Sequence, residues 1–113
     1  MHPEARVHTN HYIDPELAAT APPPSDGSRA RFGRLTDLLD ERTPDTPEAV
    51  MEILRDHGSS PQAICLHPEP EEGDEASAVL FSMVTDVESG RMWVAPGNPC
   101  EQDYVEIDLP ELR

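Results

Sequence analysis

The sequence predicts an α+β fold in which two amphipathic helices form a layer on an antiparallel sheet. Three observations carry this prediction. Apolar residues recur at helical spacing in residues 28–58, strict alternation appears near the carboxyl end, and turn residues separate short apolar runs there. The chain has 113 residues, so we expect a single domain with three parts: a strand and Pro-rich loop (1–27), a helical hairpin (28–58) and antiparallel strands (59–113).

The amino-terminal part is expected to be extended. Residues 7–13 alternate crudely and include Val, Thr, Tyr and Ile, which predicts a short strand. Residues 15–27 contain three consecutive prolines, which cannot continue a helix and supply no backbone donors. This second segment is therefore predicted to be an exposed loop.

Two helices are expected next. Ser28 is the predicted N-cap of the first helix, whose apolar positions recur at helical spacing up to about Arg42. Thr46 as N-cap and Pro47 at the first helical position predict the second helix, which we expect to end at Gly58.

The carboxyl-terminal part is predicted to form three or four antiparallel strands. Residues 76–87 are apolar on both faces, a turn follows at 88–90, and residues 91–95 form the second strand of a hairpin. Residues 104–109 alternate strictly, and the acidic, Pro-containing segment 68–75 is predicted to be an exposed turn. A strand that is apolar on both faces is typical of burial between two layers, so we expect an incomplete domain of a larger sandwich.

Charge and composition exclude several classes of function. The chain carries 23 acidic side chains against 8 basic ones, a formal charge of −15 that repels phosphate backbones and anionic lipid. We therefore expect no nucleic-acid and no membrane partner. The sequence shows neither a bilayer-spanning apolar stretch nor the pattern of a secretory signal, so we expect a cytoplasmic protein with Cys65 and Cys100 as free thiols.

Several segments, taken in order, resemble the acyl-coenzyme A:6-aminopenicillanic acid acyltransferase family of self-processing, N-terminal-nucleophile cysteine amidohydrolases and acyltransferases. The resemblance is to the carboxy-terminal portion of that family and covers nearly the whole chain. It is carried by these segments: Thr9–Tyr12, Ser28-x-x-Arg31-x-x-Arg34-Leu35, Leu54–His57, Ile64–Pro68, Val84–Asp86 and Met92–Gly97.

The resemblance implies a four-layer αββα sandwich and a reaction in which an N-terminal cysteine attacks an amide or thioester. It implies that Asn10 is the catalytic oxyanion-hole residue, since a carboxamide NH2 can donate to an oxyanion without titrating. It also implies that Arg31, and less directly Arg34, lies near the active site, where a guanidinium can bind a carboxylate of the substrate.

The residues themselves leave other roles open for these side chains. Asn10 could close an Asx-type turn, and Arg31 could be an exposed helix residue opposite Asp37 or Asp40. We expect Cys65 to be a small buried hydrophobe, and we expect no metal site and no cofactor. His57 is expected at the carboxyl end of a helix, where its charge interacts favourably with the helix dipole.

The nucleophile of the family is not apparent in this sequence. The chain begins Met1-His2-Pro3, so removal of the methionine would expose a histidine. We therefore expect the carboxy-terminal part of a cysteine-dependent amidohydrolase or acyltransferase, inactive alone, that contributes Asn10 and part of the pocket for a small-molecule acyl substrate. Its expected partner is a cysteine-bearing amino-terminal subunit of the same fold. The alternative is a non-catalytic acidic interaction domain, or a degenerate remnant, that binds a protein through its exposed sheet face.

Overall fold

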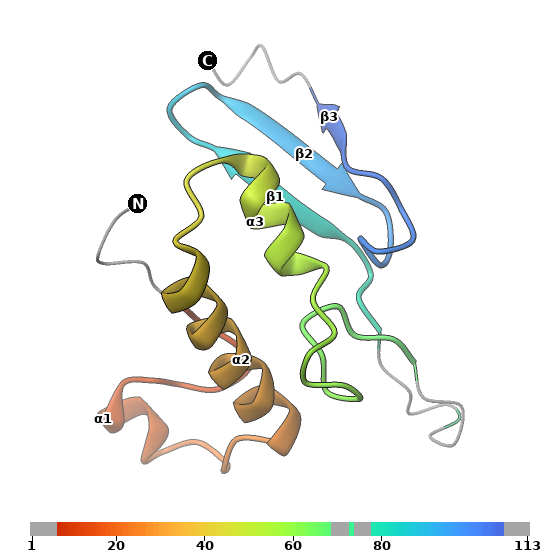
Figure 1. Cartoon of the computed structure of the whole chain (residues 1–113). Coiled ribbons are helices and arrows are strands. Elements are labelled where there is room, and N and C mark those ends of the chain that lie inside the picture. The colour runs from red at the N-terminus through yellow and green to blue at the C-terminus, as the bar shows by residue number, and fades with distance from the viewer. Residues whose placement is uncertain (1–6, 69–72, 74–77, 108–113) are drawn as a thin grey trace.

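The computed structural model describes residues 7–68, 73 and 78–107. Within these residues the chain forms three helices and a three-stranded antiparallel sheet (Figure 1). The elements are α1 (Pro15–Ala18), α2 (Asp26–Arg42), α3 (Pro47–Leu54), β1 (Ser82–Asp86), β2 (Arg91–Ala95) and β3 (Val105–Ile107). The predicted α+β class is confirmed. Apart from Pro68 and Gly73, the predicted acidic turn lies outside the described residues.

The sheet has the order β1-β2-β3, and each neighbouring pair is antiparallel. The predicted hairpin is confirmed, with Gly90 at φ 72, a left-handed conformation that glycine adopts without steric cost. The predicted first strand of the hairpin is too long, because β1 begins at Ser82. Ser82 pairs with Ala95, and the next position along the partner strand is Pro96, which has no N–H to donate to the ladder.

The core lies between α3 and one face of the sheet. Met51 of α3 is buried with Val84 of β1 and Trp93 of β2. The predicted layer of two helices on the sheet is wrong in part, because among the described residues α3 is the helix that packs substantially on the sheet, and it does so against β1. Figure 1 shows α2 at the side of this layer, joined to α3 by a short connection.

The other face of the sheet is apolar and exposed. The strand register places Met83, Val94 and Val105 in one row across the three strands, with Ile107 in the next row. Met83 is 50% exposed and Val105 is 60% exposed, and Phe81, just before β1, is also exposed. An apolar surface of this kind, uncovered by any described residue, is typical of a face that another layer covers.

The amino-terminal segment differs from the prediction in two respects. Residues 7–13 form no strand, because their polar groups bond to α2 instead of to a neighbouring strand. The predicted loop 15–27 contains one helical turn, α1, and the first residues of α2. Asp14 caps α1 by accepting a hydrogen bond from the backbone N–H of Glu16, and Pro15 is tolerated there because the first helical N–H has no partner to lose.

The helix ends follow capping chemistry, with two corrections. The N-cap of α2 is Ser25 and not Ser28, because the Oγ of Ser25 accepts the Ser28 N–H at 3.1 Å. The predicted start of α3 is confirmed, with Thr46 accepting from the Ala49 N–H. However, α3 ends at Leu54, before the predicted stop at Gly58, because the backbone leaves helical geometry at the C-cap Arg55 (φ −87, ψ 1).

A bidentate ion pair joins α2 to the segment after α3. The Nε and Nη2 atoms of Arg34 donate to the two carboxylate oxygens of Asp56 at 2.8 and 2.9 Å. The N–H of Gly58 also donates to this carboxylate, and a Cβ at Gly58 would overlap Arg34. The Arg34 hydrogen bond, followed by that of Gly58, holds the pKa of Asp56 below its ordinary value. Arg34, a resemblance-based candidate for the active site, is thus engaged in a link between two elements.

Replacement of Asp56 by asparagine is expected to destabilise the fold by ~1–3 kcal/mol near neutral pH, because it removes charge-assisted hydrogen bonds. The pKa of Asp56 is lower in the folded chain, so its stabilisation is present above the unfolded pKa and is lost as pH falls through the folded pKa. The difference in the free energy of unfolding between the variant and wild type should therefore become smaller below about pH 4. Urea unfolding at neutral pH and below about pH 4 measures this difference. Asp37→Asn, at an exposed residue, is the control. Equal stability of Asp56→Asn and wild type at neutral pH would contradict the expectation.

Candidate functional site

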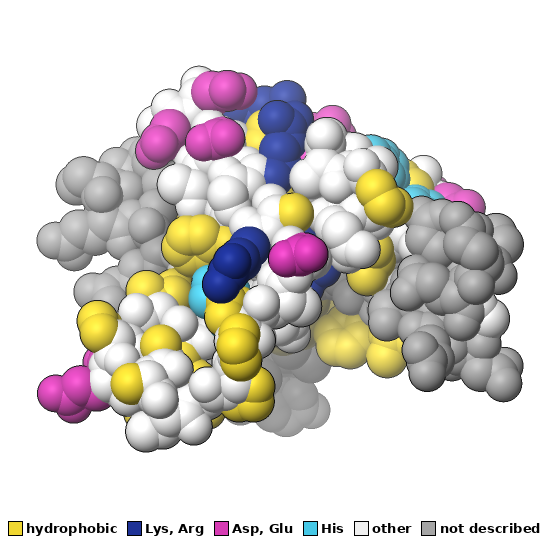
Figure 2. All heavy atoms as spheres, turned by 90° about the horizontal axis from the view of Figure 1, so that it is seen from below, with side chains coloured by type: hydrophobic (Ala, Val, Ile, Leu, Met, Phe, Trp, Pro, Cys, Tyr) yellow, Lys and Arg dark blue, Asp and Glu magenta, His cyan; other side chains and the backbone are white. Residues whose placement is uncertain are grey.

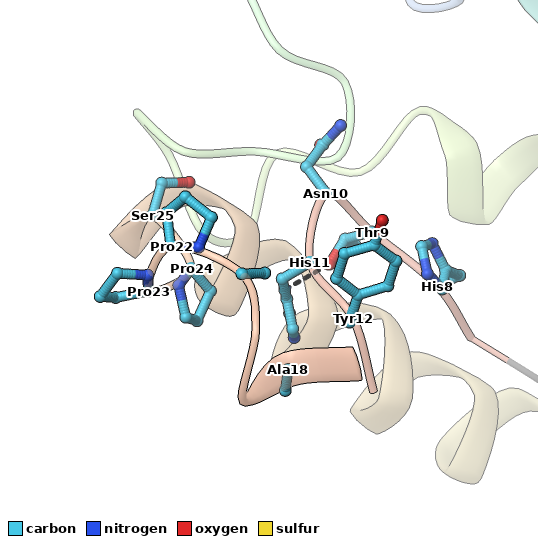
Figure 3. A pocket seen from close by; sticks show the side chains of 11 residues that line it. His8, Thr9, Asn10, His11, Tyr12, Ala18, Pro22, Pro23, Pro24 and Ser25 are labelled. Atoms are coloured by element: carbon cyan, nitrogen blue, oxygen red, sulfur yellow. Dashed lines mark hydrogen bonds between the residues drawn. The ribbon is translucent and has the colours of Figure 1, made fainter. Parts of the chain in front are cut away.

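Asn10 and Arg31 meet where the amino-terminal segment crosses α2. Arg31 Nη2 donates to Asn10 Oδ1 at 2.8 Å, although 21 residues separate them in sequence. A guanidinium only donates hydrogen bonds, so this contact assigns the oxygen end of the Asn10 amide to Arg31. Figure 3 shows the amide nitrogen of Asn10 directed away from His11 and Tyr12. Within the described part of the chain this NH2 has no hydrogen-bond partner, so it is free to donate to a ligand.

Ser28 holds the segment that carries Asn10 against α2. The Ser28 side chain is fully buried, and its Oγ accepts the backbone N–H of Asn10 at 2.8 Å. The same oxygen lies 2.7 Å from His11 Nδ1 and 3.0 Å from Thr9 Oγ1. The contact between Ser28 and His11 has the spacing of a nucleophile and its base, but a fully buried oxygen is out of reach of a substrate. Ser28 therefore positions Asn10.

Replacement of Ser28 by alanine is expected to lower stability by ~1–3 kcal/mol, because it leaves the Asn10 N–H without its buried acceptor. Each 1 kcal/mol lowers the Tm of a domain of this size by about 4–8 °C, which thermal unfolding followed by circular dichroism resolves. Thr85→Ala, which also removes a hydroxyl but at an exposed residue of β1, is the control and should change stability by less than about 0.5 kcal/mol. A Ser28→Ala variant with the wild-type Tm would show that Ser28 does not hold this segment.

Three adjoining hollows meet at Asn10. The first, of about 550 Å³, lies between residues 8–12 and the loop that contains Pro22, Pro23 and Pro24, and it is drawn in Figure 3. The other two, of about 350 and 570 Å³, are each lined by both Asn10 and Arg31. In Figure 2, hydrophobic side chains gather at the left over the part of the molecule that carries α1 and this loop. An outward NH2 beside a guanidinium in such a hollow can donate to a developing oxyanion and bind an anionic group.

A second polar cluster lies beyond the end of α3. One ligand-type atom from each of His57, Cys65, His67 and Cys100 lies within 4.8 Å of the other three. The Nε2 atoms of His57 and His67 are 3.1 Å apart, and His67 Nε2 is 3.1 Å from Cys100 Sγ. Partial desolvation, followed by the neighbouring Cys65, raises the pKa of the Cys100 thiol.

The sequence predictions for this cluster were correct for the two cysteines but wrong for His57, which lies beyond the end of α3 at Leu54 and not in the last turn of the helix. Cys65 is buried and both cysteines are free thiols, as expected. The convergence of these four side chains was not predicted, because Cys100 lies 35 positions after Cys65 and reaches it only through the sheet. The Cys65-x-His67 spacing, with His57 nearby in sequence, is the signal that could have raised the question.

The chain matches the sequence model of a known protein family. The sequence model of the acyl-coenzyme A:6-aminopenicillanic acid acyl-transferase family matches residues 1–101. The matched range contains Asn10, Arg31 and the four residues of the second cluster. No curated protein matches the chain. Among the described helices, none has the length and apolar character that crossing a membrane requires.

Proposed function

This chain belongs to the acyl-coenzyme A:6-aminopenicillanic acid acyl-transferase family, and from that premise we propose that it is the carboxy-terminal part of a cysteine-dependent enzyme that transfers acyl groups from amides or thioesters. The observation that carries the proposal is the contact between Asn10 and Arg31 where three hollows meet. The attacking thiol would come from residues outside this chain, on a preceding segment or on a separate polypeptide.

In the proposed reaction, Asn10 stabilises the charge that the attack creates. A thiolate adds to the carbonyl carbon of the substrate, and the carbonyl electron pair moves onto oxygen. The outward NH2 of Asn10 donates to this oxyanion, while Arg31 holds the other end of the amide. Collapse of the intermediate breaks the bond to the amine or thiol, which leaves with the proton taken from the attacking cysteine. Water or an acceptor amine then cleaves the resulting acyl-thioester.

Arg31 has a second proposed role in binding the substrate. Its guanidinium has five N–H groups, of which the contact with Asn10 uses one, so further donors can reach an anionic group in the hollows that both residues line. A carboxylate is a suitable ligand, since an arginine can bind it with two parallel hydrogen bonds.

Replacement of Arg31 by leucine is expected to lower kcat/KM of the assembled enzyme by about tenfold to a hundredfold, the value of a lost charge-assisted hydrogen bond. The rise in KM should be larger for a carboxylate-bearing acyl substrate than for its neutral amide, because only the former pairs with the guanidinium. Arg29→Leu, an exposed arginine of the same helix, is the control. An equal effect of Arg31→Leu on both substrates would remove the binding role.

The uncovered sheet face is the proposed docking surface for the cysteine-bearing part. Met83, Val94 and Val105 form an apolar row across it, and the family resemblance implies a second sheet stacked on the first. The helix α3 covers only the opposite face of the sheet. Burial of this row against a second sheet would leave both faces covered. The same exposed face would also serve the alternative function, a non-catalytic acidic domain that binds a protein. The formal charge of −15 favours a basic protein as that partner.

Production of the chain together with the cysteine-bearing part distinguishes the two functions. The proposed enzyme predicts a stoichiometric complex that hydrolyses an activated thioester with a burst, as the acyl-enzyme accumulates. The burst should disappear when the cysteine of the partner is replaced by alanine. A complex without turnover would favour the interaction domain, and the absence of a complex would contradict the proposed assembly.

A further inference from the structure

We propose that His57, Cys65, His67 and Cys100 bind a structural zinc ion. Zinc bonds of ~2.0–2.1 Å to nitrogen and ~2.3 Å to sulfur give tetrahedra whose ligand atoms lie about 3.3–3.8 Å apart. The corresponding separations here are 3.1 Å between the two histidine nitrogens, 3.1 Å from His67 Nε2 to Cys100 Sγ and 3.8 Å from His67 Nε2 to Cys65 Sγ. The other three separations are at most 4.8 Å, so the four atoms would have to move closer together to reach the spacing of a zinc tetrahedron.

Hydrogen bonding alone does not explain this convergence. His67 Nε2 has three neighbours at these distances, yet a neutral imidazole nitrogen offers either one proton or one lone pair. At most one of the three contacts can therefore be a good hydrogen bond at a time. A cation at the centre would satisfy all four ligand atoms together, with the two thiols giving up their protons to solvent.

The donor set favours zinc and a structural role. Two sulfurs and two imidazole nitrogens in a tetrahedral arrangement suit zinc, and four protein ligands leave no open position for a substrate. Two neighbouring side chains can support the ligands. Asn98 Nδ2 donates to Cys65 Sγ at 3.4 Å, and Glu101 Oε1 lies 3.9 Å from His67 Nδ1, the ring nitrogen that would not bind the metal.

The ligands of the proposed zinc site come from two parts of the fold. His57 follows α3, Cys65 and His67 lie in the next loop, and Cys100 lies between β2 and β3. The ion would thus tie the helical part to the sheet. Ile64 and Leu66 alternate with the ligands along the loop, and each lines one of the hollows at Asn10. Zinc would therefore also fix one wall of these hollows.

Titration of the reduced, metal-free chain with Co²⁺ and then Zn²⁺ tests the proposal without any activity measurement. We expect one cobalt ion per chain, with the intense visible bands of tetrahedral cobalt and a thiolate-to-metal charge-transfer band, both abolished by one equivalent of zinc. Zinc should also protect the exposed Cys100 thiol from a thiol reagent and raise the Tm, and a chelator should reverse both effects.

Cys100→Ser and His57→Ala are the ligand variants, and both change exposed residues so that the fold is retained. Each should weaken metal binding by more than the tenfold to hundredfold typical of a lost supporting residue. His8→Ala, an exposed histidine outside the cluster, should bind as tightly as wild type. Octahedral cobalt spectra, a Cys100 thiol that stays reactive with zinc present, or unchanged binding by Cys100→Ser would each overturn the proposal. So would a Cys65–Cys100 disulfide that forms in preference to the metal site.

Discussion

Replacement of Asn10 by aspartate is expected to slow acyl transfer by the assembled enzyme about a hundredfold to a thousandfold, the effect of removing one oxyanion-hole donor. Aspartate has the shape of asparagine and can still accept the hydrogen bond from Arg31, so the local structure should persist. It replaces the outward NH2 by an oxygen that repels the oxyanion. The loss should fall on kcat, because the donor acts in the transition state and not on bound substrate.

The control for this variant is Gln102→Glu, the same change of amide to carboxylate at an exposed residue. Its rate should equal that of wild type. Asn10→Asp should also leave the stability of the isolated chain within about 0.5 kcal/mol, since Asn10 is exposed. If Asn10→Asp retains the wild-type kcat, Asn10 is not an oxyanion-hole donor, whatever the role of Arg31.

Replacement of Val105 by lysine is expected to prevent assembly with the cysteine-bearing part. Val105 lies on the uncovered face and is 60% exposed, so the isolated chain should tolerate the change. In the assembly the same position would be buried against a second sheet, where an unpaired charge costs about 3–5 kcal/mol. The Kd of the complex, measured by isothermal titration calorimetry, should rise at least about a hundredfold.

Val87→Lys is the matched control, because it makes the same substitution in the exposed hairpin turn, away from the sheet face. Both variants should keep the Tm of the wild-type chain. If Val105→Lys and Val87→Lys assemble equally well, the apolar face is not the docking surface.

The parts of the fold that depend on local sequence could be predicted. The turn residues and the apolar runs on either side of them predict the hairpin. Thr46 and Pro47 predict the start of α3. The start of α2 was misplaced because Ser25 and Ser28 satisfy the same capping rule, and only the fold shows that Ser28 is buried against Asn10. The expected strand at residues 7–13 failed because its side chains bond to α2, a long-range effect that a pattern cannot show.

The candidate site was predictable in its members but not in its geometry. The family resemblance pointed to Asn10 and Arg31, and the structure brings them into contact. Their roles in catalysis and binding stay predictions. The spacing of His57, Cys65 and His67 could suggest that these three lie close together, but it does not include Cys100, because three of the four residues precede the sheet hairpin and Cys100 follows it. Proximity through tertiary structure is the kind of information that residue spacing does not carry.

The structure of the assembled enzyme with a tetrahedral adduct on its cysteine tests the central claim most directly. The proposed function predicts that the Nδ2 atom of Asn10 donates to the adduct oxygen at about 2.7–3.1 Å. It also predicts that Arg31 still contacts Asn10 Oδ1 and that the sheet face around Val105 is covered by the cysteine-bearing part. An adduct oxygen held by other donors, with Asn10 in solvent, would contradict the account.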